Sequence, residues 1–233
     1  VMIKEEIIHN MAKEDVDKVS ILNSYFKDIV GLDVAEIARE DVSTVDAFGR
    51  YALQSPYFSA SKCLNFFKSL GYKIGKEKIL QLEKYAEAGY LFFFTPIFAY
   101  SIKDKSIYPR KAYCGDVGFY YSTTGKLDLG RVYENLAFLE LKRRTSEEIC
   151  YWKNKSGAEV DLIVRRGTSA SQAIQVVYDL NETTREREMR GIIECAKELK
   201  PSKLLVLTRD VSEDKTIEGV KVRFVPLMDW MLE

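Results

Sequence analysis

The sequence predicts an α+β protein in two parts, a helical first half that closes with two strands and an α/β second half with a mixed sheet. Three observations predict this division. Apolar residues recur every three or four positions through 16–88, as one face of a helix requires. The apolar run 204–208 is typical of a buried strand. A stretch at 120–130 that holds two glycines separates the halves, so we place the domains at 1–122 and 123–233.

The composition is that of an ordinary globular chain, with 233 residues, 46% apolar and 30% charged. His9 is the single histidine and no CxxC pair occurs, which excludes a typical zinc site. No apolar run reaches the roughly 18 residues of a membrane span, and neither a signal peptide nor a Walker-type phosphate loop occurs. We expect a cytoplasmic protein without a membrane partner, a bound nucleotide or ATPase activity. Its four thiols should be reduced core residues: Cys63, Cys114, Cys150 and Cys195.

Charge is distributed unevenly along the chain, although basic and acidic residues number 35 each. Residues 1–46 carry five basic and eleven acidic side chains, whereas residues 59–111 carry ten basic and four acidic ones. The overall balance neither favours nor excludes a nucleic-acid partner. The local basic excess is a hint about partners rather than about fold.

Three helices are expected in the first part of the chain. They should cover roughly residues 16–30, 33–37 and 43–54. Asp33 can cap the second of them with its side chain. Pro56 ends the third, because the residue before a proline avoids helical geometry.

The next segment follows the order helix, turn, helix, strand, strand. Ser59 can cap a helix that stops at Gly71, and a second helix covers Lys76–Ala88. The apolar run that follows is interrupted by Pro96, which suits an edge or a bend. A charged turn then leads into a return strand within 112–121. This order is that of a winged helix-turn-helix.

Lysines surround this segment and are the expected phosphate contacts if it binds DNA. Asn65 and Gln81 are the candidates for base contacts, so we expect salt-dependent backbone binding with weak sequence preference. The alternative is a winged helix that contacts only proteins, with lysines that increase solubility. The predicted nucleic-acid-binding residues are Lys62, Lys73, Lys76 and Lys78 near the turn, and Lys103, Lys105 and Lys111 near the wing.

The second half should contain a helix over 131–144, two paired strands, a charged helix over 183–199, two further strands and a closing helix around Trp230. Asp161 is expected late in the first paired strand. Gln175 lies in the second strand of the pair.

A carboxylate on one strand, facing an x-Glu-x-Lys element on the next, is the metal-binding core of many nucleases. Because strand residues alternate faces, Gln175 and Val177 share one side of their strand. Here Gln175 stands where the Glu would be and Val177 where the Lys would be. The pattern predicts a nuclease-like scaffold around Asp161 with an incomplete catalytic set.

Glu134 is the third candidate catalytic residue. On a helix it is surrounded by Ala137, Phe138 and Leu141, whereas Asn135 lies on the opposite side. A carboxylate in an apolar arc needs a partner. It is either a site residue or a first-turn glutamate that the helix N-terminus favours.

Glu134 and Asp161 could together anchor Mg²⁺, because this ion prefers one or two carboxylates and keeps several waters. Gln175 could add a neutral oxygen but no charge. Such an ion would activate water and neutralise charge on a phosphodiester. Val177 cannot provide the lysine that normally assists that step.

Neighbouring charged residues offer substitutes for the missing groups. Glu159 could supply a further carboxylate, but pairing with Lys153 or Arg165 is the favoured interpretation. Arg185 and Arg187 could replace the absent lysine if their helix packs across the sheet. A solvated, charge-rich helix face is the alternative.

Several segments, taken in order, resemble the C-terminal half of a family of archaeal and bacterial AAA+-type ATPases. In that family an upstream P-loop domain is followed by a winged helix and a restriction-endonuclease-like domain. The segments are YFKDIVGLDV at 25–34, the helix-turn-helix at 59–91, YPRKAYCGDVGF at 108–119, GRVYENLAFLELKRR at 130–144, YWKNKSGAEVDLIV at 151–164, TTREREMR at 183–190 and VPLMDW at 225–230.

The resemblance implies that Glu134, Asp161 and Gln175 occupy positions of the PD-(D/E)XK nuclease motif, with departures at Gln175 and Val177. It also implies an ATPase domain or another protein as partner. We therefore expect a DNA-binding module with a degenerate nuclease-like domain that cuts weakly or not at all. The alternatives are a Mg²⁺-dependent DNA nuclease that uses Glu134 and Asp161, and a protein-interaction module that regulates an ATPase without contacting DNA.

Overall fold

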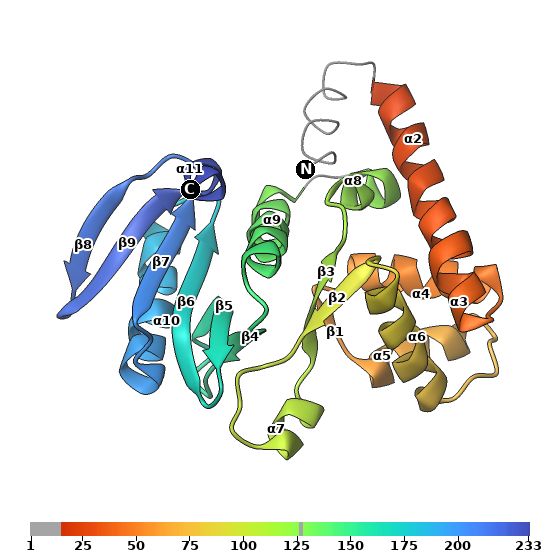
Figure 1. The fold of residues 1–233 in the computed structure, drawn as a ribbon, viewed down its shortest axis with the longest axis horizontal. Coiled ribbons are helices and arrows are strands. Elements are labelled where there is room, and N and C mark those ends of the chain that lie inside the picture. Colours follow the sequence, from red (N-terminus) through yellow and green to blue (C-terminus); the bar gives the residue numbers. More distant parts are fainter. Residues whose placement is uncertain (1–14, 126–127) are drawn as a thin grey trace. The chain divides into compact units, whose positions relative to one another are not determined.

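The computed structural model describes residues 15–125 and 128–233 (Figure 1). This part of the chain forms two compact units. The first comprises the described residues up to Phe94 and those from Lys111 to Gly125, and the second comprises Thr95–Arg110 and Asp128–Glu233. Helices accompany a three-stranded and a six-stranded sheet, so the predicted α+β class is confirmed.

The first unit is mainly helical. Its strands are β1 (Tyr57–Phe58), β2 (Phe92–Thr95) and β3 (Arg110–Cys114), hydrogen-bonded in the order β1-β3-β2. Its helices are α2 (Asp15–Asp28), the π-helix η1 (Ile29–Ala35), α3 (Glu36–Ala38), α4 (Val42–Gln54), α5 (Ala60–Ser69), α6 (Lys76–Ala88) and α8 (Gly118–Thr124). The predicted bounds of α6 are confirmed, whereas α8 was not predicted.

The start of α4 depends on a side-chain cap. Asp41 accepts hydrogen bonds from the backbone N–H groups of Ser43 at 2.8 Å and Thr44 at 3.3 Å. These bonds satisfy donors that have no partner within a first helical turn. The helix ends at Gln54, before Pro56, as predicted.

The predicted cap at Asp33 is wrong. Asp33 is exposed inside η1, which continues α2 without a break. The wider π-helical turn buries Val30, Val34 and Ala35. Tertiary burial therefore outweighs the capping signal at this position. Ser59 does occupy the N-cap position of α5, but its side chain makes no capping hydrogen bond.

Aromatic rings from three elements form the core of the first unit. Phe48 of α4 lies 5.5 Å from the ring of Phe58 in β1, and Phe58 lies 4.8 Å from Phe94 in β2. All three side chains are buried. Tilted and edge-on pairs of this kind add to the free energy of burial, so they hold the small sheet against α4.

The second unit is built on a sheet with the strand order β4-β5-β6-β7-β9-β8. The sheet is mixed, as predicted. Strands β6, β7 and β9 are parallel neighbours, and the other pairs are antiparallel. The strands are β4 (Glu148–Lys153), β5 (Glu159–Arg166), β6 (Ser169–Val177), β7 (Lys203–Thr208), β8 (Glu213–Ile217) and β9 (Val220–Pro226). The helices are α7 (Ile102–Ile107), α9 (Leu129–Arg144), α10 (Glu182–Leu199) and α11 (Leu227–Leu232).

Helices cover both faces of this sheet (Figure 1). Ile163 and Ala173 share a core with the buried side of α10, whereas their neighbours Val164 and Gln172 point to the face that carries α9 and α11. This alternation is that of a sheet with two covered faces.

The segment Thr95–Arg110 lies between β2 and β3 in sequence but belongs to the second unit. Phe98 N–H donates to the carbonyl of Tyr151 in β4 at 2.6 Å, and Tyr151 N–H donates to the carbonyl of Pro96 at 3.0 Å. The Tyr151 hydroxyl donates to the carbonyl of Pro109 at 2.7 Å. The segment therefore occupies the outer edge of β4 and satisfies part of its backbone.

All four cysteines are free and buried, which confirms their predicted place in the core. No helix in residues 15–125 or 128–233 is long and apolar enough to cross a membrane.

The buried thiols should resist alkylation. Desolvation raises the pKa of Cys63, Cys150 and Cys195 to about 12, so very little reactive thiolate exists near pH 8. We expect iodoacetamide to leave the folded protein unmodified and to label four sites per chain in denaturant, as measured by intact mass. Fast labelling of the folded protein would contradict the observed burial.

Candidate functional site

Asp161 and Gln175 lie side by side on the antiparallel strands β5 and β6. Leu162 and Ile174 form the last regular pair of this ladder, and Asp161 and Gln175 come next. At this position side-chain oxygens, rather than backbone carbonyls, accept the backbone N–H groups. Asp161 Oδ2 accepts the N–H of Val176 at 2.9 Å, and Gln175 Oε1 accepts the N–H of Asp161 at 3.3 Å. Asp161 thus closes the end of the strand pair, near the start of β5 rather than late in it.

A buried polar network continues from this pair to α10. Gln175 Nε2 donates to Glu188 Oε2 at 2.5 Å. Asp161, Gln175 and Glu188 are 7%, 4% and 9% exposed. Arg187 binds the other carboxylate oxygen of Glu188 with two N–H groups, at 2.8 and 2.5 Å. The guanidinium offsets a carboxylate charge that would otherwise be costly to bury.

The chemistry of this network favours a structural role. Asp161, Gln175 and Glu188 each have an acceptor atom that already receives an N–H group. Within the described ranges 15–125 and 128–233, no group of three or more His, Cys, Asp or Glu side chains could hold a metal ion. The carboxylates of Asp161 and Glu188 could anchor a metal ion only if Arg187 released Glu188, because Mg²⁺ and a guanidinium compete for the same oxygens.

Glu188 is the site residue that sequence reasoning missed. It stands in a charge-rich stretch, which suggested a solvated face. The sequence did contain a usable signal, because the uncharged residues Gly191 and Ile192 follow Glu188 by three and four positions. The structure buries all three. Residues at this spacing share one helix face.

Glu134 lies half-buried on α9, and α9 covers the sheet face opposite α10. Asn135, which helix geometry places on the side opposite Glu134, is completely buried. The reason is that α9 contacts both β6 and α11. A helix covered on two sides buries a wider arc than the single stripe that periodicity assumes.

The other charged candidates mostly make ion pairs. Lys153 contacts Glu159 at 3.0 Å, which confirms the favoured interpretation of Glu159. Arg185 pairs with Glu213 of β8 at 2.5 Å, and its guanidinium lies 5.6 Å from the ring centroid of Phe224. Of the two arginines proposed as substitutes for the missing lysine, Arg187 is therefore the one joined to the network.

Most of the predicted nucleic-acid-binding lysines near the turn between α5 and α6 are exposed. Lys62, Lys73 and Lys76 are exposed, and so is Lys68. Lys78 is half-buried and forms an ion pair with Glu40.

The lysines near the predicted wing have other surroundings. Lys103 is exposed. Lys105 contacts Glu148 at 2.7 Å, so part of its charge is offset. Lys111 is only 4% exposed, and its ammonium lies 5.8 Å from the ring centroid of Tyr57. A buried lysine held over an aromatic ring is poorly placed to reach a phosphate.

Residues 129–230 match a domain of unknown function, DUF4143. This domain is found at the C-terminal side of AAA-ATPase-like proteins. The match covers α9 to α11 and therefore includes the whole six-stranded sheet. It agrees with the ATPase resemblance at this coarse level and names no chemistry.

The chain is also similar to uncharacterized protein MJ1544 of Methanocaldococcus jannaschii. The two are 33% identical over 183 residues, which is 75% of this chain and 40% of that protein. The chain thus spans well under half the length of this relative. No solved structure matches the chain significantly.

Proposed function

We propose that the chain is a nucleic-acid-binding module that works with an ATPase domain. In this proposal the first unit is a winged helix that contacts the phosphate backbone, and the DUF4143 region is a restriction-endonuclease-like domain with little or no cleavage activity. The observation that carries it is the order α4-β1-α5-α6-β2-β3 with the strand arrangement β1-β3-β2. A helix-turn-helix followed by two strands is the order of a winged helix.

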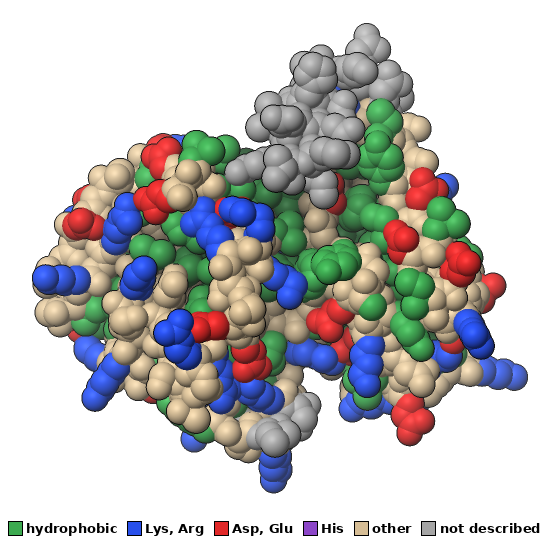
Figure 2. Space-filling model, in the orientation of Figure 1, with side chains coloured by type: hydrophobic (Ala, Val, Ile, Leu, Met, Phe, Trp, Pro, Cys, Tyr) green, Lys and Arg blue, Asp and Glu red, His purple; other side chains and the backbone are tan. Residues whose placement is uncertain are grey.

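Charge on the first unit supports a backbone contact. Lys62 and Lys68 are exposed on α5, Lys73 in the turn and Lys76 at the first position of α6. Figure 2 shows Lys and Arg side chains at the end of the first unit where α5 and α6 lie. The N-terminus of α6 adds the positive end of a helix dipole, which also favours phosphate.

The segment at the wing position is engaged elsewhere, so we assign it no direct role in DNA contact. Residues 95–110 belong to the second unit and run along β4. Lys105 is paired with Glu148. Binding should therefore depend on α5 and α6, with strong salt dependence and little sequence preference.

Weak or absent cleavage is expected because two positions of the nuclease motif hold residues that cannot perform its chemistry. Val177 occupies the lysine position and is 6% exposed among apolar neighbours of α10. Gln175 supplies no charge. The partner part of the proposal rests on the place of DUF4143 domains in AAA-ATPase-like proteins and on the greater length of MJ1544.

Binding of labelled duplex DNA, measured by fluorescence anisotropy across a salt series, tests the proposal. We expect Lys73→Gln with Lys76→Gln to weaken binding about tenfold and to lower the salt slope by about 1.8, since each lost phosphate contact removes about 0.9. Lys27→Gln with Lys155→Gln removes the same charge from exposed positions that belong to neither α5 nor α6, and this variant should bind like the wild type.

Two results would overturn this assignment. The first is an absence of duplex binding at low salt. The second is an equal loss in both double variants, which would reduce the effect to net charge. Cleavage of DNA by the wild type with Mg²⁺ or Mn²⁺, abolished in Asp161→Asn, would favour the nuclease alternative. That alternative has one observation in its favour, the two buried carboxylates of Asp161 and Glu188 joined through Gln175.

A further inference from the structure

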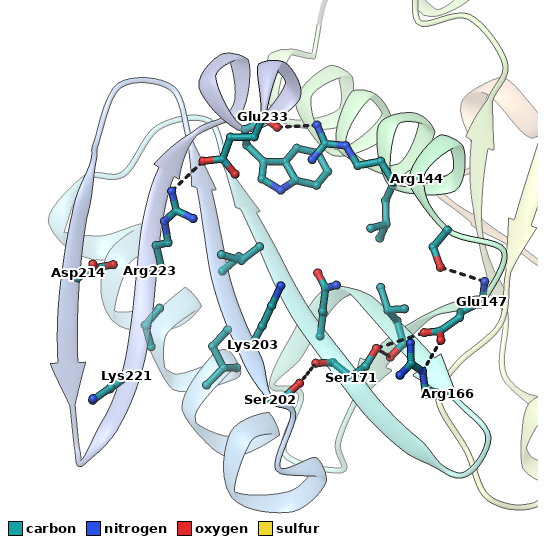
Figure 3. Close-up of a pocket in the computed structure, with 18 of the residues that line it drawn as sticks. Arg144, Glu147, Arg166, Ser171, Ser202, Lys203, Asp214, Lys221, Arg223 and Glu233 are labelled. Carbon is teal, nitrogen blue, oxygen red and sulfur yellow. Dashed lines mark hydrogen bonds and ion pairs between the residues drawn. The ribbon is translucent and has the colours of Figure 1, made fainter.

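A groove of about 980 Å³ lies on the face of the six-stranded sheet that carries α9 and α11 (Figure 3). Its lining comes from the end of α9, from β5 to β9 and from α11. Leu141, Val164, Leu205 and Trp230 give the groove an apolar component. All of its lining residues belong to the second unit.

The lining is rich in positive charge, with six basic and three acidic side chains. Three arginines at its borders already have partners (Figure 3). Arg166 contacts Glu147 at 2.5 Å, and Arg223 contacts Glu233 at 2.8 Å. Arg144 contacts Glu140 at 2.8 Å and donates to the carbonyl of Trp230 at 2.7 Å.

Lys203 and Lys221 differ from these arginines. Neither forms an ion pair with any residue in 15–125 or 128–233. Lys203 extends into the hollow, and Lys221 lies at its border on β9 (Figure 3). Lys203 lies two residues before Leu205 and Lys221 two residues before Arg223, the first pair of the parallel ladder, so both belong to the same sheet face.

Basic side chains outnumber acidic ones in this concave lining, so the groove has a net positive charge. A bound anion would offset this charge, and a concave site strengthens the field that attracts the anion. Gln172 pairs with Lys203 across β6 and β7, and Thr216 pairs with Lys221 across β8 and β9. Gln172 and Thr216 also line the groove, so an amide and a hydroxyl belong to the same surface, which suits an oxygen-rich ligand.

We propose that this groove binds a phosphate ester, held by Lys203 and Lys221. Phosphate oxygens match the ammonium, hydroxyl and amide donors of this lining, and its apolar component can accept a base or sugar. Arg166 and Arg223 can add contacts, because their exposed ion pairs are worth only about 0–1 kcal/mol and can be exchanged for a phosphate. The site lies outside the α5–α6 surface and is independent of duplex binding there.

Phosphate esters of this kind occur in a nucleic-acid strand and in a free nucleotide. Two probes distinguish them, a labelled oligodeoxythymidine of about ten nucleotides, matched to typical single-strand sites, and dTMP. Anisotropy reports the first, and Trp230 fluorescence reports both. Binding of the oligonucleotide without competition by dTMP assigns the groove to a strand, whereas equal competition assigns it to a nucleotide.

Lys203→Gln with Lys221→Gln should weaken oligonucleotide binding about tenfold and lower its salt slope by about 1.4, since each single-strand phosphate contact contributes about 0.7. Lys155→Gln with Lys197→Gln is the matched control, with two exposed lysines of the same unit that do not line the groove. Melting temperatures of both double variants should equal that of the wild type.

The inference is overturned if the wild type binds neither probe, or if the control variant loses as much affinity as the groove variant. Lys73→Gln with Lys76→Gln should leave single-strand binding unchanged while it weakens duplex binding. Loss of both in that variant would transfer all binding to the first unit and overturn the groove. Failure of the α5–α6 proposal alone would appear as unchanged duplex binding in the same variant.

Discussion

Gly191→Ala is expected to destabilise the second unit by about 3 kcal/mol. Gly191 is buried where α10 crosses β5, and a Cβ atom there would lie 2.4 Å from the carbonyl oxygen of Glu159. That oxygen is backbone in a paired strand and cannot rotate away. The helix must therefore move off the sheet and take Ile192 and Ile193 partly out of the core.

The sign of the change is diagnostic, because Gly→Ala inside a helix without such a contact stabilises by up to about 1 kcal/mol. Urea unfolding followed by tryptophan fluorescence measures it, and both tryptophans, Trp152 and Trp230, belong to the second unit. Gly130→Ala is the control, since its nearest neighbour would be Asp128 Oδ1 at 3.4 Å. A Gly191→Ala protein as stable as the wild type would refute the close approach of α10 to β5.

Asp161→Ala is expected to cost about 3 kcal/mol, and Asp161→Asn about 1 kcal/mol. The alanine leaves the N–H of Val176 without the acceptor that it has at 2.9 Å, whereas the bond from the backbone N–H of residue 161 to Gln175 Oε1 remains. The asparagine keeps a carbonyl oxygen in place and loses only the charge. The same unfolding measurement tests both variants.

This pair of variants separates a structural Asp161 from a metal-binding one. For a structural role, adding Mg²⁺ should leave the unfolding free energies of the wild type and of Asp161→Asn unchanged. Stabilisation of the wild type by Mg²⁺ that disappears in Asp161→Asn would contradict that role, because an ion stabilises the state that binds it. Glu188→Gln provides a second test, since it removes the other buried carboxylate of the network.

Local pattern was a good guide where burial agreed with it. The bounds of α6 follow from helical spacing between two glycines, and α11 surrounds the buried Trp230. Strand β8 was missed because it is an exposed edge strand rich in charge, so it has no apolar alternation to detect. Asp33 was wrongly taken as a cap because the chain continues through η1.

Nucleic-acid binding remains a prediction, but the lysines predicted to bind differ in their surroundings in the structure. Lys73 and Lys76 are exposed, whereas Lys111 is buried beside Tyr57. No local signal separates these lysines, because all lie in one basic stretch of sequence. The difference comes from the pairing of β3 in the small sheet.

By itself the sequence determined most of the helices, the basic turn between α5 and α6, and the strand pair that carries Asp161 and Gln175, but neither α8 nor β8. These features depend on neighbours within a few residues, which periodicity and charge describe. The tertiary structure alone decided that Glu188 completes the Asp161 network and that Lys203 and Lys221 share a groove. Those contacts depend on strand order and on which helix covers which face, and both are set by packing between residues far apart in the chain.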